Sequence, residues 1–229
     1  GDVFCWFESF VRGRTHRAKI NSSFSKVMTS DCSVPQGSVL GPLLFSLYIT
    51  SLANIVPCFN LRLHMYADDV LVYGHCTQSN LHDLISKMSS CIDELISWRS
   101  ANRLLLNADK CEFLWCSSPR RRSAIPSDLL RIGNRALTPS LTTKYLGVLF
   151  DTEMSFKAHV TKVVSSCFGA LQQIRSVRRF LPQPLLVRLI ESLVVSRLDF
   201  CISVLYAIPR KITDRLQYVL RASARLVFG

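Results

Sequence analysis

Two adjacent carboxylates, Asp68 and Asp69, lie between two short runs with the composition of β-strands, and this arrangement constrains the fold more than any other stretch. Apolar and polar residues alternate along residues 61–66, and residues 70–73 are β-branched, apolar and aromatic, so both flanks are typical of strands. Strand side chains alternate between faces, so neighbouring acids reach one site only where a tight turn breaks the alternation. The stretch 61–74 therefore predicts a β-hairpin with both carboxylates at its connection.

Carboxylates at a hairpin connection are available to a hard divalent cation. Mg²⁺ takes oxygen ligands and keeps positions open for substrate phosphates. The alternative is an Asp-rich surface turn without chemistry, which is the usual meaning of two adjacent Asp residues. The apolar strands on both sides favour a metal site, because a plain exposed turn does not need them. A zinc site formed by His75, Cys76 and His82 is a further alternative, but no CxxC pair supports it.

The positive charge of the chain is confined to its second part. The chain has 229 residues, 48% of them hydrophobic, which is enough for one large domain or two small ones. Its formal net charge is +12; residues 1–116 carry 10 basic and 10 acidic residues, whereas residues 117–229 carry 18 and 6. A basic half joined to a neutral, carboxylate-bearing half suits a protein that holds a polyanion and performs metal chemistry. A solvated basic surface explains the charge equally well.

The nine cysteines indicate the compartment. Their number is odd, no CxxC pair occurs and no secretory signal is present, which favours reduced thiols in an intracellular protein of the cytoplasm, the nucleus or both. We expect Cys5, Cys58, Cys91 and Cys167 to be small core residues. The first residue is Gly rather than Met, which indicates a piece of a longer sequence.

Hydrophobic periodicity divides the chain into a mixed part and a helical part. It predicts helices over residues 2–11, 39–56, 78–101, 156–177, 183–197 and 212–228, and strands over residues 17–20, 24–29, 104–106, 112–116, 129–132 and 144–150. The run 39–56 lies in a stretch without charge, and we expect a buried core helix there rather than a transmembrane span, because polar residues interrupt it. The fold class is therefore α+β, with a boundary near residue 152.

Four stretches resemble, in the correct order, motifs of the reverse transcriptase of non-LTR retrotransposons of the jockey and chicken-repeat type. SVPQGSVLGPLLFSLYI at 33–49 resembles the B motif, YADD at 66–69 the catalytic C motif, LLLNADKCEFL at 104–114 the D motif, and YLGVLFD at 145–151 the E motif. The resemblance implies a partial right-hand polymerase palm over residues 1–152, an antiparallel sheet packed with helices. An all-helical basic thumb over residues 153–229 follows it.

The resemblance also implies an activity and roles for particular residues. The family is an RNA-directed DNA polymerase that extends a DNA primer on an RNA template with deoxynucleoside triphosphates, using two Mg²⁺ ions or Mn²⁺ in their place. It implies catalytic roles for Asp68, Asp69 and Lys110, with Asp68 and Asp69 as metal ligands and Asp68 the more direct one. It places Pro35, Gln36, Gly37 and Tyr66 along the nucleotide and template, and Tyr145, Leu146 and Gly147 against the primer end. Lys110 has a simpler alternative, a solvated side chain in a strand turn.

The chain departs from the family pattern in three ways. Ser33 stands where the B motif usually has Gly, and Cys111 stands where the D motif usually has Thr or Ser. The larger departure is upstream, because the chain begins too late to contain the fingers and the A motif with its first catalytic Asp. We therefore expect the 229 residues alone to be an inactive fragment. The alternatives are a non-catalytic remnant or host-retained fragment that only binds nucleic acid and, with least support, a membrane anchor formed by residues 39–56.

Overall fold

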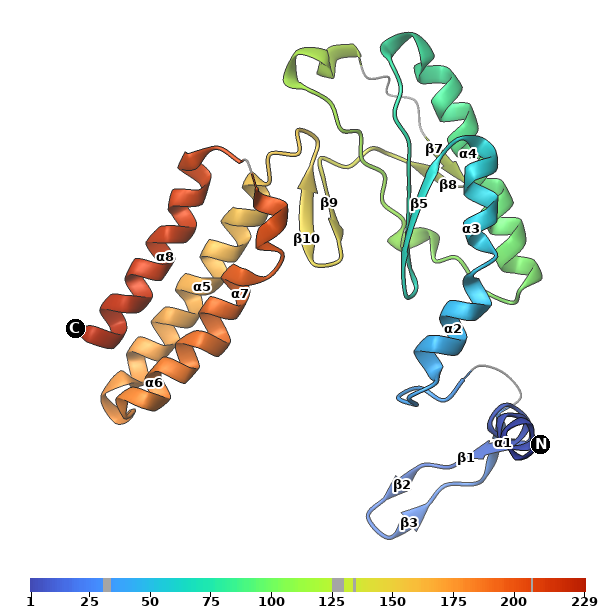
Figure 1. Ribbon diagram of the computed structural model, residues 1–229, viewed down its shortest axis with the longest axis horizontal. Coiled ribbons are helices and arrows are strands. Elements are labelled where there is room, and N and C mark those ends of the chain that lie inside the picture. Colours follow the sequence, from blue (N-terminus) through green and yellow to red (C-terminus); the bar gives the residue numbers. More distant parts are fainter. Residues whose placement is uncertain (31–33, 125–129, 134, 207) are drawn as a thin grey trace. The chain divides into compact units, whose positions relative to one another are not determined.

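The computed structural model of the chain describes residues 1–30, 34–124, 130–133, 135–206 and 208–229 (Figure 1). These residues form two compact units, residues 1–104 and residues 105–229. Within the described ranges, the strands pair into five two-stranded antiparallel ladders, and helices fill most of the remaining regular structure. The predicted α+β class is therefore confirmed. The boundary expected near residue 152 separates functional parts and stays a prediction.

The first unit contains four helices, three strand pairs and two 3₁₀ helices among its described residues. Its elements are α1 (Asp2–Val11), β1 (Arg14–His16), β2 (Lys19–Ile20), β3 (Ser23–Phe24), β4 (Met28–Ser30), α2 (Gly41–Ile49), α3 (Leu52–Ile55), a 3₁₀ helix (Val56–Phe59), β5 (Arg62–Tyr66), β6 (Asp69–Tyr73), a 3₁₀ helix (Gln78–Asn80) and α4 (Leu81–Ala101). The pairs are β1 with β4, β2 with β3 and β5 with β6. The helices predicted over 2–11 and 78–101 are confirmed. The strands predicted over 17–29 form an interrupted hairpin, because the Ser25 hydroxyl accepts a hydrogen bond from Ala18 N–H at 2.9 Å.

The second unit begins irregularly and ends in a helical bundle. Its described elements are two 3₁₀ helices (Ala108–Lys110 and Pro119–Ala124), β7 (Leu130–Ile132), β8 (Arg135–Leu137), β9 (Thr142–Tyr145), β10 (Val148–Asp151), α5 (Lys157–Val177), a 3₁₀ helix (Arg178–Phe180), α6 (Gln183–Ile190), a π-helical segment (Glu191–Val195), α7 (Ser196–Asp199), a 3₁₀ helix (Ile202–Leu205) and α8 (Arg210–Phe228). β7 pairs with β8 and β9 with β10. The three helices predicted after residue 152 are confirmed. The middle one is interrupted by the π-helical segment.

The strand pair predicted over residues 104–106 and 112–116 is wrong. Apart from the 3₁₀ helix Ala108–Lys110, this segment is irregular. Leu105 is 94% exposed, so the apolar run 104–106 is not the buried strand that its composition predicts. The second stretch runs beside β9 and β10 with isolated bonds: Ser140 N–H donates to Phe113 O at 2.7 Å, and Lys144 N–H donates to the Glu112 carboxylate at 3.2 Å. A side chain thus replaces the backbone acceptor, and no ladder forms.

The apolar run 39–56 is only partly buried. Ile49 at the end of α2, together with Leu52 and Val56, is at most 5% exposed, and α3 and the following 3₁₀ helix pack against α4. Leu43 and Leu47 of α2 are more than half exposed, so the prediction of a buried core helix is wrong for α2. α4 ends at Ala101, and the Tyr48 hydroxyl near the end of α2 donates to the backbone carbonyl of the next residue, Asn102, at 2.7 Å. The end of α2 thus already lies at the end of α4, which leaves the earlier turns of α2 without this helix to cover them.

The helical stretch Gly41–Phe59 is long and apolar enough to cross a membrane by length and composition alone, and among the described residues it is the one stretch of this kind. A core helix of a soluble protein passes the same test. The stretch is divided into α2, α3 and a 3₁₀ helix, with Pro57 near the start of the last. Such a break in the helix is accepted in a bilayer only where other protein groups satisfy the backbone.

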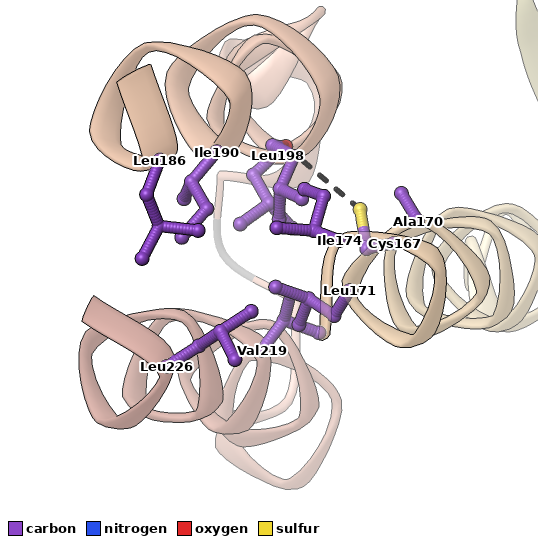
Figure 2. Close-up of a cluster of buried hydrophobic side chains, with 10 residues drawn as sticks. Cys167, Ala170, Leu171, Ile174, Leu186, Ile190, Leu198, Val219 and Leu226 are labelled. Carbon is purple, nitrogen blue, oxygen red and sulfur yellow. Dashed lines mark hydrogen bonds between the residues drawn. The ribbon is translucent and has the colours of Figure 1, made fainter. Parts of the chain in front are cut away.

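The core of the second unit lies between α5, α6–α7 and α8. Figure 2 shows Leu186, Ile190 and Leu198 pointing toward Val219 and Leu226 of α8, with the side chains of α5 beside them. The Cys167 thiol donates to Val194 O, in the π-helical segment, at 3.8 Å. Burial raises the pKa of Cys167, although the charge of Arg197 opposes this effect.

Two of the four cysteines expected in the core are there. Cys91 and Cys167 are fully buried, and burial raises the pKa of Cys91 to about 11. Cys5 and Cys58 are exposed, so the expectation is wrong for them. Cys5 lies on α1, none of whose residues is buried, and small size alone does not place a residue inside.

A second core cluster joins the β9–β10 hairpin to the bundle. Val148, Phe156 and Val160 pack together with residues that precede and begin α8. Buried His159 adds a polar link, since its Nδ1 accepts a hydrogen bond from Leu149 N–H of β10 at 3.4 Å. Burial lowers the pKa of His159, and the positive charge of Lys162 lowers it further. The imidazole is therefore neutral near pH 7, and its Nδ1 carries no proton, as an acceptor of a hydrogen bond must.

The loop between β10 and α5 is organised around Asp151. Its carboxylate accepts from Ser155 N–H at 2.8 Å, from the Ser155 hydroxyl at 3.0 Å and from Glu153 N–H at 3.1 Å. Burial raises the pKa of Asp151, but these hydrogen bonds to the ionised form outweigh it, so the pKa lies below its usual value. The ionised side chain thereby fixes the turn that leads into α5.

Candidate active site

The Asp68–Asp69 pair lies at the tip of the β5–β6 hairpin. The two strands pair from Arg62 opposite Tyr73 to Tyr66 opposite Asp69, which leaves Ala67 and Asp68 as a two-residue connection. Two-residue connections are the tightest common hairpin loops and usually need a residue with positive φ. Ala67 supplies it, with φ of +51°. The hairpin predicted over residues 61–74 is confirmed. Of the two carboxylates expected at its connection, Asp68 lies there, whereas the expectation is wrong for Asp69, which begins β6 and pairs with Tyr66.

The hairpin has one half-buried apolar face and one exposed face. Leu63, Met65, Val70 and Val72 are half-buried, whereas their neighbours along both strands are exposed. Asp69 belongs to the exposed face and lies opposite Tyr66, which is 64% exposed. Asp68 is exposed as well, in the connection. The structure thus brings Tyr66 and both carboxylates together at one accessible end of the hairpin.

The hairpin is held rigidly at its other end. Gly74 follows β6 and packs so closely that an added Cβ would lie 2.8 Å from Leu61 Cδ2 and 2.9 Å from Leu84 Cδ1. Leu61 and Leu84 are both buried, and Leu84 belongs to the inward face of α4. A cavity of about 370 Å³ lies beside Leu61 and Leu63, and none of the sequence-predicted site residues lines it. The carboxylates are therefore carried at the tip of a hairpin whose base is fixed by packing.

Both carboxylates are available to a cation. Within the described ranges, neither Asp68 nor Asp69 forms an ion pair, and both side chains are exposed. Their oxygens are the ligand type that Mg²⁺ prefers, so this donor set fits a share of a divalent-metal site. In the described part of the chain, no three His, Cys, Asp or Glu residues group together closely enough to hold a metal ion. The pair therefore offers two exposed carboxylates, and no third His, Cys, Asp or Glu of the described residues lies close enough to complete a metal site with them.

The Pro35–Gln36–Gly37 segment forms a turn before α2. Ser38 N–H donates to Pro35 O at 3.1 Å, and the Ser38 hydroxyl accepts from Gly41 N–H at 3.1 Å, which ties the turn to the first residue of the helix. Gly37 has φ of +83°, a conformation that L residues rarely adopt, and its Cα faces open space. Gln36 is exposed. The turn presents backbone and an amide to solvent, and among the described residues no hydrogen bond joins it to Asp68 or Asp69.

Lys110 closes a 3₁₀ helix in the second unit. The Asn107 side chain accepts from Asp109 N–H at 3.1 Å at the start of this helix. Asp109 is paired with Arg135, whereas Lys110 is exposed and has no ion pair with any described residue. Its charge is therefore available to an anion. The strand turn expected around Lys110 is replaced by this 3₁₀ helix.

Tyr145 ends β9, and Leu146 and Gly147 form the connection of a hairpin, so the single strand predicted over residues 144–150 is wrong. Tyr145 lies opposite Val148, and the two residues between them both have positive φ, +45° for Leu146 and +86° for Gly147. An added Cβ at Gly147 would lie 2.9 Å from Phe200 Cε1. The glycine within the apolar run was the available signal, because an interior glycine often marks a bend or a close approach.

The predicted site residues are divided between the two units. Pro35, Gln36, Gly37, Tyr66, Asp68 and Asp69 lie in residues 1–104, and Lys110, Tyr145, Leu146 and Gly147 lie in residues 105–229. Sequence reasoning assigned the basic charge of the second part to no particular residue. The structure groups Arg175, Arg178 and Arg179 around one hollow at the end of α5. Their spacing of three and four residues in a helical run was the signal that could have identified them.

Comparison with known proteins identifies the family. The family model of the reverse transcriptase (RNA-dependent DNA polymerase) matches residues 2–150. The RNA-directed DNA polymerase from mobile element jockey of Drosophila melanogaster is 25% identical over 161 residues, which is 68% of this chain and 17% of that protein. The probable RNA-directed DNA polymerase from transposon X-element, also of Drosophila melanogaster, is 30% identical over 166 residues, 70% of this chain and 17% of that protein.

A third relative, the probable RNA-directed DNA polymerase from transposon BS of the same fly, is 28% identical over 180 residues, 73% of this chain and 19% of that protein. The chain thus spans less than a fifth of the length of these relatives. No solved structure matches the chain. The family match covers well over half of the chain and contains the B, C and D motifs that the sequence predicted. The chain therefore belongs to the reverse transcriptase (RNA-dependent DNA polymerase) family.

Proposed function

We propose that the chain is part of the palm, residues 1–152, and the thumb, residues 153–229, of the RNA-directed DNA polymerase of a retrotransposon. The observation that carries this proposal is the exposed Asp68–Asp69 pair at the tip of the β5–β6 hairpin, inside the matched region. Further support is that the family match ends at residue 150, shortly before the helical bundle begins with α5. The enzyme would act on an RNA template and a DNA primer, inside the cell.

In this proposal, Asp68 and Asp69 hold the catalytic metal. When bound, two Mg²⁺ ions, or Mn²⁺ in their place, would activate the primer 3′-hydroxyl and neutralise charge on the nucleotide phosphates. Asp68 is the more direct ligand, because a residue in the connection is not restricted to one face of the sheet. The packing of Gly74 against Leu61 and Leu84 keeps the hairpin fixed, and a fixed carboxylate needs little reorganisation during the reaction.

The remaining predicted residues have roles around this centre. The open turn Pro35–Gln36–Gly37 lets a nucleotide or template approach the backbone, and Tyr66 offers a ring on the face of Asp69. Lys110 supplies a charge, or a proton, to the departing pyrophosphate. The tight turn at Tyr145, Leu146 and Gly147 contacts the primer end. These roles follow the motif resemblance, and the exposure of Gln36, Tyr66 and Lys110 supports them.

The number of carboxylates limits what the chain does alone. Two divalent ions repel each other, and a site that also leaves positions for phosphates and a hydroxyl needs more negative charge than two carboxylates supply. We propose that a third carboxylate comes from the A motif, outside these 229 residues. The chain alone then performs no template-directed synthesis. A longer chain that includes the A motif extends a primer with Mg²⁺.

Primer extension on an RNA template tests this proposal. Asp68→Asn in the longer chain should reduce the rate about a thousandfold or more, because loss of a metal ligand removes several kcal/mol of transition-state stabilisation. The matched control is Asp93→Asn, an exposed acid on α4 of the same unit, which should leave the rate unchanged. Efficient synthesis by the 229 residues alone, or by the longer chain with Asp68→Asn, would show that the metal site is elsewhere.

A second candidate function is nucleic-acid binding without catalysis. The observation that favours it is the cluster of arginines at the end of α5, which does not depend on the carboxylate pair. In this case the chain binds RNA with a steep salt dependence, whereas the longer chain with the A motif remains unable to extend a primer. Measuring binding and extension on the same preparation therefore separates the two candidates.

A further inference from the structure

Three arginines at the end of α5 and in the 3₁₀ helix that follows it line one hollow. Arg175, Arg178 and Arg179, together with Ser176, line a cavity of about 530 Å³. Residues three and four apart in a helix share one face, so the side chains of Arg178 and Arg179 lie on the same side as that of Arg175. The cavity is open to solvent rather than enclosed, because Arg175, Ser176 and Arg179 are all exposed.

Among the residues that the structure describes, no acid is paired with this cluster. Within the described ranges, none of the three arginines takes part in an ion pair. Like charges at helical spacing repel and destabilise a helix by a few tenths of a kcal/mol per pair. A negatively charged ligand would relieve this repulsion and would accept hydrogen bonds from several guanidinium groups at once.

An exposed aromatic ring lies against one of the arginines that line the hollow. Phe180 is 72% exposed, and the guanidinium carbon of Arg179 lies 4.7 Å from the centre of its ring. A guanidinium over one face of a ring is a favourable cation–π arrangement, and the ring remains accessible to a second planar group. Basic side chains that follow a phosphate backbone, combined with an exposed ring on which a base stacks, are the recognition elements of single-stranded nucleic acid.

We propose that Arg175, Arg178, Arg179 and Phe180 form a binding site for single-stranded RNA at the end of α5. The arginines hold successive phosphates, and an unpaired base stacks on Phe180. A duplex would keep its bases stacked on one another and leave the ring unused. The inference rests on the proposed function only in that the chain handles nucleic acid. It locates one contact with the template at a place that no motif of the family match includes, since the match ends at residue 150.

Fluorescence anisotropy with a labelled single-stranded oligouridine and the full 229-residue chain tests the site. The triple substitution Arg175→Gln, Arg178→Gln and Arg179→Gln removes three charges from the hollow. The matched control removes three charges from the opposite ends of the helices, by Lys157→Gln, Arg210→Gln and Lys211→Gln. These residues begin α5 and α8, whose starts are joined by a hydrogen bond from Arg215 to the Thr161 hydroxyl at 2.8 Å. The start of α5 is about 27 Å along the helix axis from Arg175.

The phosphate contacts predict a change in salt dependence. Each phosphate contacted by a protein contributes about −0.7 to the slope of log affinity against log salt for a single strand. The triple substitution in the hollow should therefore reduce the slope by about 2, while the control triple leaves it nearly unchanged. Equal changes in both variants would overturn the site, because the charge would then act diffusely.

The stacking contact predicts a separate effect. Phe180→Leu keeps an apolar side chain but removes the aromatic face, and it should weaken oligouridine binding about fivefold or more without changing the salt slope. Phe180→Tyr should restore the affinity. Unchanged affinity with Phe180→Leu would overturn the stacking role, and circular dichroism checks that each variant keeps its helical signal.

Two further outcomes separate this inference from its alternatives. Anionic phosphatidylserine vesicles that bind the unsubstituted chain but not the triple variant, while RNA affinity stays the same, would identify a membrane surface as the ligand and overturn the site. Absence of RNA binding by the unsubstituted chain would overturn it together with the nucleic-acid binding of the proposed function. If binding is present and only the hollow proves irrelevant, the proposed function stands and the inference fails.

Discussion

Alanine at Gly147 should destabilise the second unit through two distinct effects. The first is conformational, because φ of +86° is costly for a residue with a Cβ, by about 1–2 kcal/mol. The second is steric, because the new Cβ would lie 2.9 Å from Phe200 Cε1 and 3.1 Å from Phe200 Cζ. Phe200 is 53% exposed, so its ring can turn away at a cost of roughly 0.5–1.5 kcal/mol. The sum is about 1.5–3.5 kcal/mol.

Two other glycines of the same unit separate these effects. Gly133 also has positive φ, +56°, but an added Cβ would meet nothing within 4 Å, so Gly133→Ala should show the conformational cost alone, about 1–2 kcal/mol. Gly169 lies within α5 with open space around it, so Gly169→Ala should stabilise the unit by about 0.5–1 kcal/mol through helix propensity.

Urea unfolding followed by circular dichroism measures the free energy of unfolding of the three variants. Adding Phe200→Ala to Gly147→Ala removes the steric effect, so the cost of the glycine substitution should fall to that of Gly133→Ala. A cost for Gly147→Ala no greater than for Gly133→Ala would refute the close contact with Phe200. A loss of stability with Gly169→Ala would refute the open space on that side of α5.

Three further predictions concern pH, thiol chemistry and membranes. Because burial keeps the pKa of His159 below its usual value of about 6.5, the unfolded chain takes up a proton first as pH falls. The His159 contribution to stability is therefore fully present above about pH 6.5 and is lost as pH falls toward the lowered pKa. Urea titrations between pH 8 and 5 should show this decrease in the free energy of unfolding in the wild type but not in His159→Gln. Cys91 and Cys167 should react with Ellman's reagent only on unfolding, since both are fully buried, whereas the exposed thiols react at once; immediate reaction of all thiols would contradict the packing. The chain should stay in the aqueous phase in Triton X-114 partitioning, because its apolar stretch Gly41–Phe59 is broken into three segments and does not form one continuous helix. Recovery of the chain in the detergent phase would support a membrane role.

Local patterns predicted the helices and the hairpin well, because their signals lie within the elements themselves. Along residues 61–74, the alternation of apolar residues and the interruption by Asp68 are both local, and the observed register leaves Asp68 in the connection. The helix over residues 78–101 is similarly defined by its own apolar stripe, which the structure places against neighbouring elements. Predictions from residue types succeeded where the spacing of the apolar residues matches the period of the element that forms, two residues for a strand and 3.6 for a helix.

Two of the wrong strand predictions involve contacts that are distant along the chain. Glu112–Cys116 has the composition of a strand, but the Glu112 carboxylate takes the backbone donor of Lys144, and the ladder does not form. Residues 144–150 form a hairpin, not one strand, because Leu146 and Gly147 turn the chain where Phe200 packs against it. Neither partner can be recognised from the local sequence.

The sequence alone determined the family, the order of the motifs, the α+β class and the pairing of two carboxylates at a hairpin tip, because each depends on residue types at short spacing. Only the tertiary structure decided which apolar residues are covered and which charges lie together. α2 has the composition of a core helix, yet Leu43 and Leu47 stay exposed, because the main packing against α4 is made by α3 and the 3₁₀ helix that follow. The charge of residues 117–229 is a sum over the sequence, but its concentration at Arg175, Arg178 and Arg179 depends on the helical path that brings them around one hollow. Burial and charge clustering are properties of three-dimensional neighbours, and composition does not specify neighbours.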